Sequence, residues 1–146
     1  MIGVFGAIGW HTIAKTETGT MDMVINGAGY DLALAFSELQ VQTSFASCVS
    51  DGKTSELMRM DLEEHGLVDL LLREPDLPFT GSVAWYEHGH ERLMRAHPAF
   101  DAFYPDSYLE NFVQRNDLLV CELGIHARTL DKLNTLACVK GIPILW

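Results

Sequence analysis

Short apolar runs alternate with longer amphipathic stretches along this chain of 146 residues. The apolar runs predict buried strands, because a strand covered on both faces has a nearly continuous hydrophobic sequence. The amphipathic stretches predict helices that pack against such strands. The predicted strands are 2–8, 43–49, 117–122 and 142–146, and the predicted helices are 30–39, 53–65, 105–113 and 129–139. This order is typical of an α/β fold, with a Rossmann-like parallel sheet and helices on both faces.

Two segments do not fit this alternation. Residues 12–25 and 82–95 each have two strand-like runs around a turn that contains glycine. We expect them to form hairpins that make a small β lid projecting from the main sheet, within a single domain of residues 1–146. A further strand-like run, 68–72, stands apart from the four runs of the predicted sheet.

The predicted helices have recognisable faces and ends. In the helix 30–39, Leu32, Ala35, Phe36 and Leu39 lie on one apolar face. Gly66 and Gly141 follow two of the predicted helices, in the position where glycine commonly ends a helix.

The composition excludes several classes of partner. The apolar fraction of 48% and the charged fraction of 21% are typical of a globular protein. The net charge of −10 and the scattered basic residues argue against binding to nucleic acid or an acidic membrane surface. No apolar stretch approaches the ~18 residues of a membrane span, and the strand-like start at Met1 lacks the basic segment of a secretory signal. We therefore expect a cytoplasmic protein.

The cysteines and histidines predict neither disulfides nor a metal site. Cys48, Cys121 and Cys138 are an odd number, and each lies in an apolar run, so we expect buried free thiols. The segment His88-Gly89-His90 is more typical of a hairpin tip in contact with water than of a metal site.

A glycine-rich turn, Asn26-Gly-Ala-Gly-Tyr-Asp31, opens the first predicted helix. Such a turn presents backbone N–H groups and the positive end of the helix dipole to a polar or anionic ligand. It therefore predicts a ligand site at this end of the helix.

The ordered set of motifs resembles the ribokinase-like carbohydrate kinases, the PfkB family. The matching segments are Val4–His11, Asn26–Asp31, Ala46–Gly52, His65–Val68 and Thr80–Val83 with Glu87–Arg92. The resemblance covers almost the whole chain but only about the N-terminal half of the family, which carries the substrate site and the lid. It implies that projecting strands cover a sugar or nucleoside.

The resemblance also implies which residues bind substrate. His11 stands where the family usually has an Asp that accepts hydrogen bonds from sugar hydroxyls. Gly27 and Gly29 are retained from the family's glycine turn, and Asp31 replaces its usual Asn. Glu122 ends its predicted strand, at the edge of the sheet where such folds bind ligands. These five residues are the expected substrate-binding residues.

Structural roles remain open for the same positions. His11 fits a partly buried histidine bonded to the backbone, and Asp31 fits a first-turn acid stabilised by the helix dipole. Glu122 fits a cap for the helix that begins near Ala127. Gly27 and Gly29 fit positions where the backbone geometry requires glycine.

The resemblance assigns no catalytic residue to this chain. In the complete family the C-terminal half supplies the ATP site, with its magnesium, and a Gly-Ala-Gly-Asp motif whose Asp is the base. Gly27-Ala28-Gly29 is similar to that motif but in chain order matches the sugar-contacting turn. We expect this chain alone to hold neither ATP nor metal, because phosphoryl transfer needs both halves.

Three functions follow from these patterns. The first is a partial or degenerate sugar-kinase-like protein that binds a sugar, a nucleoside or a protein without transferring a phosphoryl group. The second is a carbohydrate or nucleoside kinase whose other half comes from another chain or lies beyond this sequence. The third is a structural subunit that reuses the fold.

The last predicted strand suggests a partner. In the complete family the strand matching 142–146 lies inside the sheet, and an apolar strand at an open edge pairs readily with another chain. We expect the protein to self-associate, or to dock to another polypeptide, through this edge or through the lid.

Overall fold

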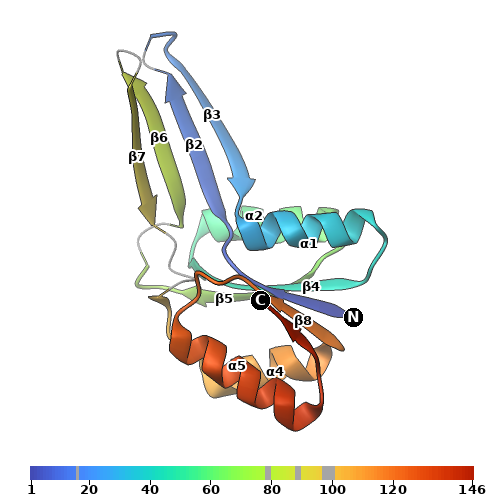
Figure 1. The fold of residues 1–146 in the computed structure, drawn as a ribbon. Coiled ribbons are helices and arrows are strands. Elements are labelled where there is room, and N and C mark those ends of the chain that lie inside the picture. The colour runs from blue at the N-terminus through green and yellow to red at the C-terminus, as the bar shows by residue number, and fades with distance from the viewer. Residues whose placement is uncertain (16, 78–79, 88–89, 97–100) are drawn as a thin grey trace.

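A computed structural model describes residues 1–15, 17–77, 80–87, 90–96 and 101–146. Its centre is a five-stranded sheet with the order β5-β4-β1-β8-β9, in which all neighbouring strands are parallel (Figure 1). The strands are β1 (Ile2–Phe5), β4 (Thr43–Ser50), β5 (Val68–Glu74), β8 (Leu118–Cys121) and β9 (Ile144–Leu145).

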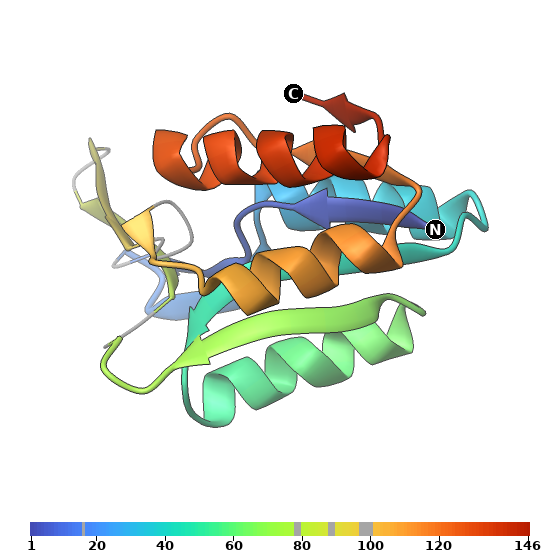
Figure 2. The same cartoon turned by 90° about the horizontal axis from the view of Figure 1, so that it is seen from below.

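Helices cover both faces of this sheet. The helices α1 (Ala28–Glu38) and α2 (Lys53–Glu64) lie on one face, and α4 (Asp106–Arg115) and α5 (Ala127–Lys140) lie on the other (Figures 1 and 2). The predicted α/β class is therefore confirmed. Among the described residues, no helix is long and apolar enough to span a membrane.

The strand limits differ from the prediction in two respects. The run near 68–72 belongs to the parallel sheet, as its edge strand β5 beside β4, and the sequence pattern left it outside. Asp69 and Arg73 are tolerated there because an edge strand is only partly covered. The first strand ends at Phe5 instead of residue 8, because the chain leaves the sheet there and crosses to the lid.

Each face of the sheet has its own core. Val4, Phe45 and Val49 lie in the core beneath α1 and α2. On the other face, the ring of Phe5 packs edge-to-face on Tyr104 and Phe112, with centroids 4.8 and 5.4 Å apart. All eight residues of β4 are buried, which explains why its sequence is almost uniformly apolar or small.

The rotation of α1 differs from the predicted one. Leu32 and Leu39, which were placed on its apolar face, are exposed, whereas Tyr30 and Ala33 are buried against the sheet. The Tyr30 hydroxyl donates to Asp61 of α2, and its pKa is raised by burial and then by this hydrogen bond. The helix takes this rotation because Gly29 lies against the backbone of Gly6 and Ala7, the two residues that follow β1.

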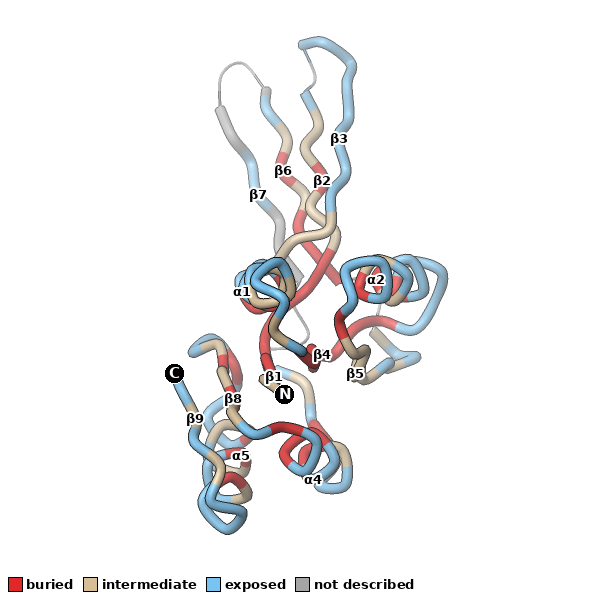
Figure 3. Tube along the Cα trace, turned by 90° about the vertical axis from the view of Figure 1, so that its right-hand side faces the viewer, coloured by how far each residue is buried: buried red, intermediate tan, exposed pale blue. Residues whose placement is uncertain are grey.

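A second, four-stranded sheet forms the lid. Its order is β3-β2-β6-β7, made of β2 (Gly9–Lys15), β3 (Thr20–Asn26), β6 (Gly81–Glu87) and β7 (His90–Ala96). The pairs β2–β3 and β6–β7 are antiparallel, so both predicted hairpins are confirmed, and a parallel pairing of β2 with β6 joins them. The tip residues 88–89 lie outside the described residues. The lid projects from the α/β body, and β3 is largely exposed along one side of it (Figures 1 and 3).

The base of the lid is tightly packed. A Cβ on Gly9 would lie 2.7 Å from the Cα of Gly81, so only glycines allow the two strands to approach this closely. Beside them, the Thr80 hydroxyl accepts from the backbone N–H of Ser50 at 2.8 Å, and the Thr80 carbonyl accepts from the N–H of Trp10 at 3.1 Å. These bonds tie the lid to the carboxyl end of β4.

The cysteines divide into two groups. Cys48 and Cys121 are buried free thiols, as expected. Cys138 is exposed, so the prediction was wrong for this residue, because it lies near the end of α5 on the side that faces away from the sheet. Burial raises the pKa of Cys48 and of Cys121 to about 12, and for Cys48 the nearby Glu74 contributes as well.

We expect one thiol to react in the folded protein. At pH 8 the buried thiols stay protonated and shielded, whereas Cys138 is accessible to a water-soluble disulfide reagent. Thiol titration should give one fast group in the native state and all three in denaturant, and Cys138→Ser should abolish the fast reaction. Fast reaction of the Cys138→Ser protein would contradict this assignment.

Candidate ligand-binding site

The carboxyl edge of the parallel sheet contains a topological switch point. After β1 the chain makes the lid hairpin and then enters α1 on one face, whereas after β8 it enters α5 on the other face (Figure 1). Because β1 and β8 are neighbours, the two chain paths diverge between their carboxyl ends. In open α/β sheets this divergence leaves the crevice in which ligands bind.

Glu122 joins the segments that meet at this point. Its Oε2 accepts hydrogen bonds from the backbone N–H groups of Ala7, at 2.8 Å, and of Gly29, at 3.2 Å. Its own N–H donates to the Phe5 carbonyl at 2.9 Å. The carboxylate therefore lies at the positive end of α1 and fixes the helix to the end of β1.

The alternative role of Glu122 as a helix cap is wrong. The N-cap of α5 is His126, whose ring Nδ1 accepts from the N–H of Arg128 at 3.2 Å. Sequence reasoning missed this because histidine is uncommon at an N-cap compared with Ser, Thr, Asp or Asn.

Gly27 and Gly29 are required by the backbone. Gly27 has φ of 154°, and a Cβ there would lie 2.2 Å from the carbonyl oxygen of Ala7. A Cβ on Gly29 would lie 2.6 Å from the Cα of Gly6. The structural role predicted for both glycines is thus present, and their packing brings the start of α1 to the carboxyl end of β1.

Asp31 lies in the first turn of α1 with an exposed side chain. Its N–H donates to the Gly27 carbonyl at 2.8 Å, which is the first regular bond of the helix. Within the part of the chain that the structure describes, its carboxylate makes no hydrogen bond or ion pair. The dipole of α1 stabilises the charge, and the oxygens remain available to a ligand.

His11 lies in the lid and is half-buried. Its Nδ1 is 2.5 Å from the hydroxyl of Ser82, its registered neighbour on β6, and which atom donates depends on the histidine tautomer. The partner is therefore a side chain and not the backbone group of the structural alternative. Sequence analysis did not single out Ser82, although it lies in the Thr80–Val83 motif.

The structure brings together Gly27, Gly29 and Glu122, with Asp31 in the adjoining helical turn. His11 is positioned from the lid, two residues beyond Gly9, which pairs with Asn26 at the glycine turn. Among the described residues, no side-chain hydrogen bond or ion pair joins His11 to the other four. The described residues contain no cluster of three or more His, Cys, Asp or Glu side chains that would hold a metal ion.

This architecture is the ribokinase-like fold of sugar and nucleoside kinases. Ribokinase from Arabidopsis thaliana, solved with ribose and ATP, superposes with a TM-score of 0.78 at 14% identity, over 98% of this chain and 51% of that one. Ribokinase from Giardia lamblia gives a TM-score of 0.76 at 12% identity, over 97% of this chain and 48% of that one. Adenosine kinase from Schistosoma mansoni, in complex with 2-fluoroadenosine, gives a TM-score of 0.76 at 9% identity, over 98% of this chain and 54% of that one.

The likeness is one of fold, and it has a limited extent. No protein-family model matches the sequence, and no curated protein matches it either. The chain spans about half the length of the solved structures that it resembles. The sequence resemblance to ribokinase-like kinases is therefore confirmed in three dimensions, for a half-length version of the fold.

The contacts of Glu122 predict its contribution to stability. Glu122→Ala removes the acceptor for two backbone N–H groups and should lower the free energy of unfolding by roughly 2 kcal/mol. Glu122→Gln should cost less, because its amide oxygen still accepts. Urea unfolding measures both, with the exposed Glu110→Ala on α4 as control, expected within about 0.5 kcal/mol of the parent. Equal effects of Glu122→Ala and Glu110→Ala would refute the anchoring role.

Proposed function

We propose that this chain binds a sugar or nucleoside at the carboxyl edge beneath the lid, and that alone it does not transfer a phosphoryl group. The observation that carries the proposal is the topological switch point between β1 and β8, where the glycine turn and Glu122 hold the start of α1. Solved structures with this fold contain ribose or a nucleoside analogue, which supports a polyhydroxylated ligand.

The polar groups at the edge fit such a ligand. Asp31 offers carboxylate oxygens that accept from hydroxyl groups. His11 accepts or donates according to its tautomer, and its bond to Ser82 fixes the ring. The residue types match hydroxyl recognition, although His11 and Asp31 replace the Asp and Asn usual in the resembling family.

Ligand-induced stabilisation tests the binding. Thermal unfolding with D-ribose, D-fructose or adenosine should show an increase in Tm for at least one of them, because a ligand that binds only the folded state stabilises it. Asp31→Asn should weaken the affinity for that ligand about tenfold, the effect of removing a charged hydrogen-bond partner. Glu38→Gln, an exposed acid at the other end of α1, is the matched control and should leave affinity unchanged.

Two outcomes would contradict the proposal. The absence of any Tm increase with the three compounds at millimolar concentration would remove the binding function. Turnover of ATP with any of them by the purified chain would show that the chain transfers a phosphoryl group alone.

A second candidate function is that of the acceptor-binding part of a two-part kinase. An apolar surface around the β9 edge favours it, since Leu123, Val139, Leu145 and Trp146 are all exposed. A cavity of about 340 Å³ is bordered by Leu123, Leu130 and Trp146 on this side. Apolar surface beside an open strand edge is typical of a protein contact, either with a second polypeptide or with another copy of this chain.

We expect the isolated chain to self-associate through this edge. Sedimentation velocity at micromolar concentration should give a species larger than a monomer. Leu145→Lys should shift it towards the monomer, because a charge on an edge strand opposes pairing. Leu39→Lys, at the exposed apolar C-cap of α1, is the control and should leave the distribution unchanged. A strict monomer in the parent protein would rule out this association.

A further inference from the structure

Ser82 and His11 form a side-chain pair on one face of the lid. Ser82 is only 5% exposed, and its hydroxyl lies 2.5 Å from the Nδ1 of His11. The preceding residue, Trp10, points to the opposite face, where its Nε1 donates to the Thr54 carbonyl of α2 at 3.4 Å. His11 therefore lies on the face turned away from α2. Its registered neighbour on β3, Val24, is 51% exposed, so the space beside the imidazole is open.

The Ser82 hydroxyl has one acceptor for its proton. Among the described residues, its only hydrogen bond is the one to His11. Buried polar groups are nearly always hydrogen-bonded, and a hydroxyl carries a single proton, so donation to Nδ1 satisfies it. If Nδ1–H donated instead, the Ser82 proton would have no acceptor in the described part of the chain. The arrangement therefore favours the neutral imidazole with its proton on Nε2.

The Nε2 of His11 is left for a ligand. It has no partner among the described residues, where the only buried side-chain atom without a partner is Ser47 Oγ, so Nε2 is in contact with solvent. With its proton in place, Nε2 donates and cannot accept. The Asp usual at this position in the resembling kinases does the opposite, because an ionised carboxylate only accepts.

We propose that the Ser82–His11 pair makes the lid a hydrogen-bond donor, and that the site selects a polyhydroxylated ligand with a carbonyl or carboxylate oxygen at this point. This rests on the proposed binding of a sugar beneath the lid, and it narrows the class to oxidised sugars, the lactones and the sugar acids. A ligand hydroxyl that accepts from Nε2–H must still place its own proton, whereas a carbonyl or carboxylate oxygen has none to place. His11 is the contact residue, and Ser82 is the positioning residue.

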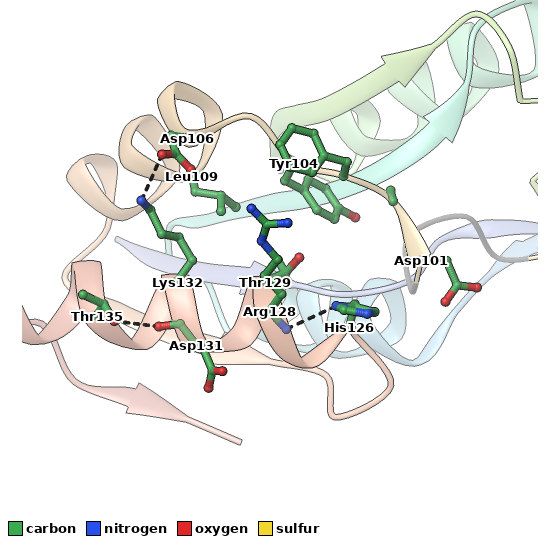
Figure 4. A pocket seen from close by; sticks show the side chains of 12 residues that line it. Asp101, Tyr104, Asp106, Leu109, His126, Arg128, Thr129, Asp131, Lys132 and Thr135 are labelled. Carbon is green, nitrogen blue, oxygen red and sulfur yellow. Dashed lines mark hydrogen bonds and ion pairs between the residues drawn. The ribbon is translucent and has the colours of Figure 1, made fainter.

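A carboxylate has a second place to bind, which the experiment must separate from the lid. A cavity of about 460 Å³ beside α4 and α5 contains Arg128 and Lys132 (Figure 4). Lys132 lies 3.0 Å from Asp106, and the Arg128 guanidinium carbon lies 5.7 Å from the centroid of the Phe103 ring. None of the described residues that line this cavity is an expected substrate-binding residue. Arg128→Gln therefore serves as a control.

Calorimetric titration with three related ligands tests the selection. In place of the anomeric hydroxyl of D-ribose, D-ribonolactone has a carbonyl and D-ribonate has a carboxylate. The parent should bind one of the oxidised ligands about tenfold more tightly than D-ribose, the effect of one hydrogen bond, and the tighter of the two identifies the preferred acceptor. His11→Asp should reverse the preference, because its carboxylate accepts from a hydroxyl and repels ribonate. Gln114→Glu, which adds the same charge at an exposed position on α4, and Arg128→Gln should keep the preference of the parent.

Proton–nitrogen correlation spectra of the imidazole test the donor without any ligand. At pH 8, where histidine is ordinarily neutral, His11 should show a bare Nδ1 and a protonated Nε2. Ser82→Ala removes the hydroxyl, so it should give a mixture of tautomers and reduce the preference for the oxidised ligand roughly threefold. This variant also decides the question should His11→Asp fail to fold.

Failure of this selection can be told apart from failure of the proposed function. A proton on Nδ1, or D-ribose bound at least as tightly as both oxidised ligands, would overturn the donor role and leave sugar binding in place. An unchanged preference in His11→Asp would do the same. Absence of binding by all three ligands would overturn the proposed function, and the selection with it, even with the proton on Nε2.

Discussion

The structure depends on a backbone contact between two glycines. Gly6, just after β1, and Gly29, in the first turn of α1, approach so closely that neither position has space for a Cβ. The Glu122 carboxylate stabilises the contact, because it accepts hydrogen bonds from backbone N–H groups in both segments. Three parts of the chain, far apart in sequence, are thereby fixed at the carboxyl edge of the sheet, and the rotation of α1 follows.

The candidate ligand site has a fixed part and an available part. Gly27, Gly29 and Glu122 contribute to the fold whether or not a ligand is present, because their contacts are all within the chain. The Asp31 carboxylate makes no hydrogen bond to the described residues. His11 is oriented by a single side-chain hydrogen bond to Ser82. Changes at the fixed positions therefore alter stability and binding together, whereas changes at Asp31 alter stability only through its interaction with the dipole of α1.

Much of the architecture follows from the pattern of apolar residues. Strands buried on both faces, such as β4, have short runs of apolar or small residues, and the hairpins follow from their turns. The edge strand β5 was not placed, because a partly covered strand with charged residues resembles a connecting segment. The rotation of α1 was not predictable from its leucines, since a glycine contact set it and not the most hydrophobic face.

The residues of the candidate site could be predicted from the sequence, but their hydrogen-bond partners could not. Chain order and resemblance singled out Glu122, yet its hydrogen bonds to Ala7 and Gly29 depend on contacts across more than ninety positions. Periodicity carries no information on such distant pairs.

The parallel pairing of β2 with β6 has a consequence for how the chain folds. Trp10 and Gly81, the first registered pair, are separated by 71 positions, whereas each hairpin closes through a short turn. Pairing such distant strands is opposed by loop-closure entropy. Few contacts offset this entropy until β4 and β5 have brought the two hairpins together. The two hairpins can thus form early and separately, but their union into one lid waits for the central sheet.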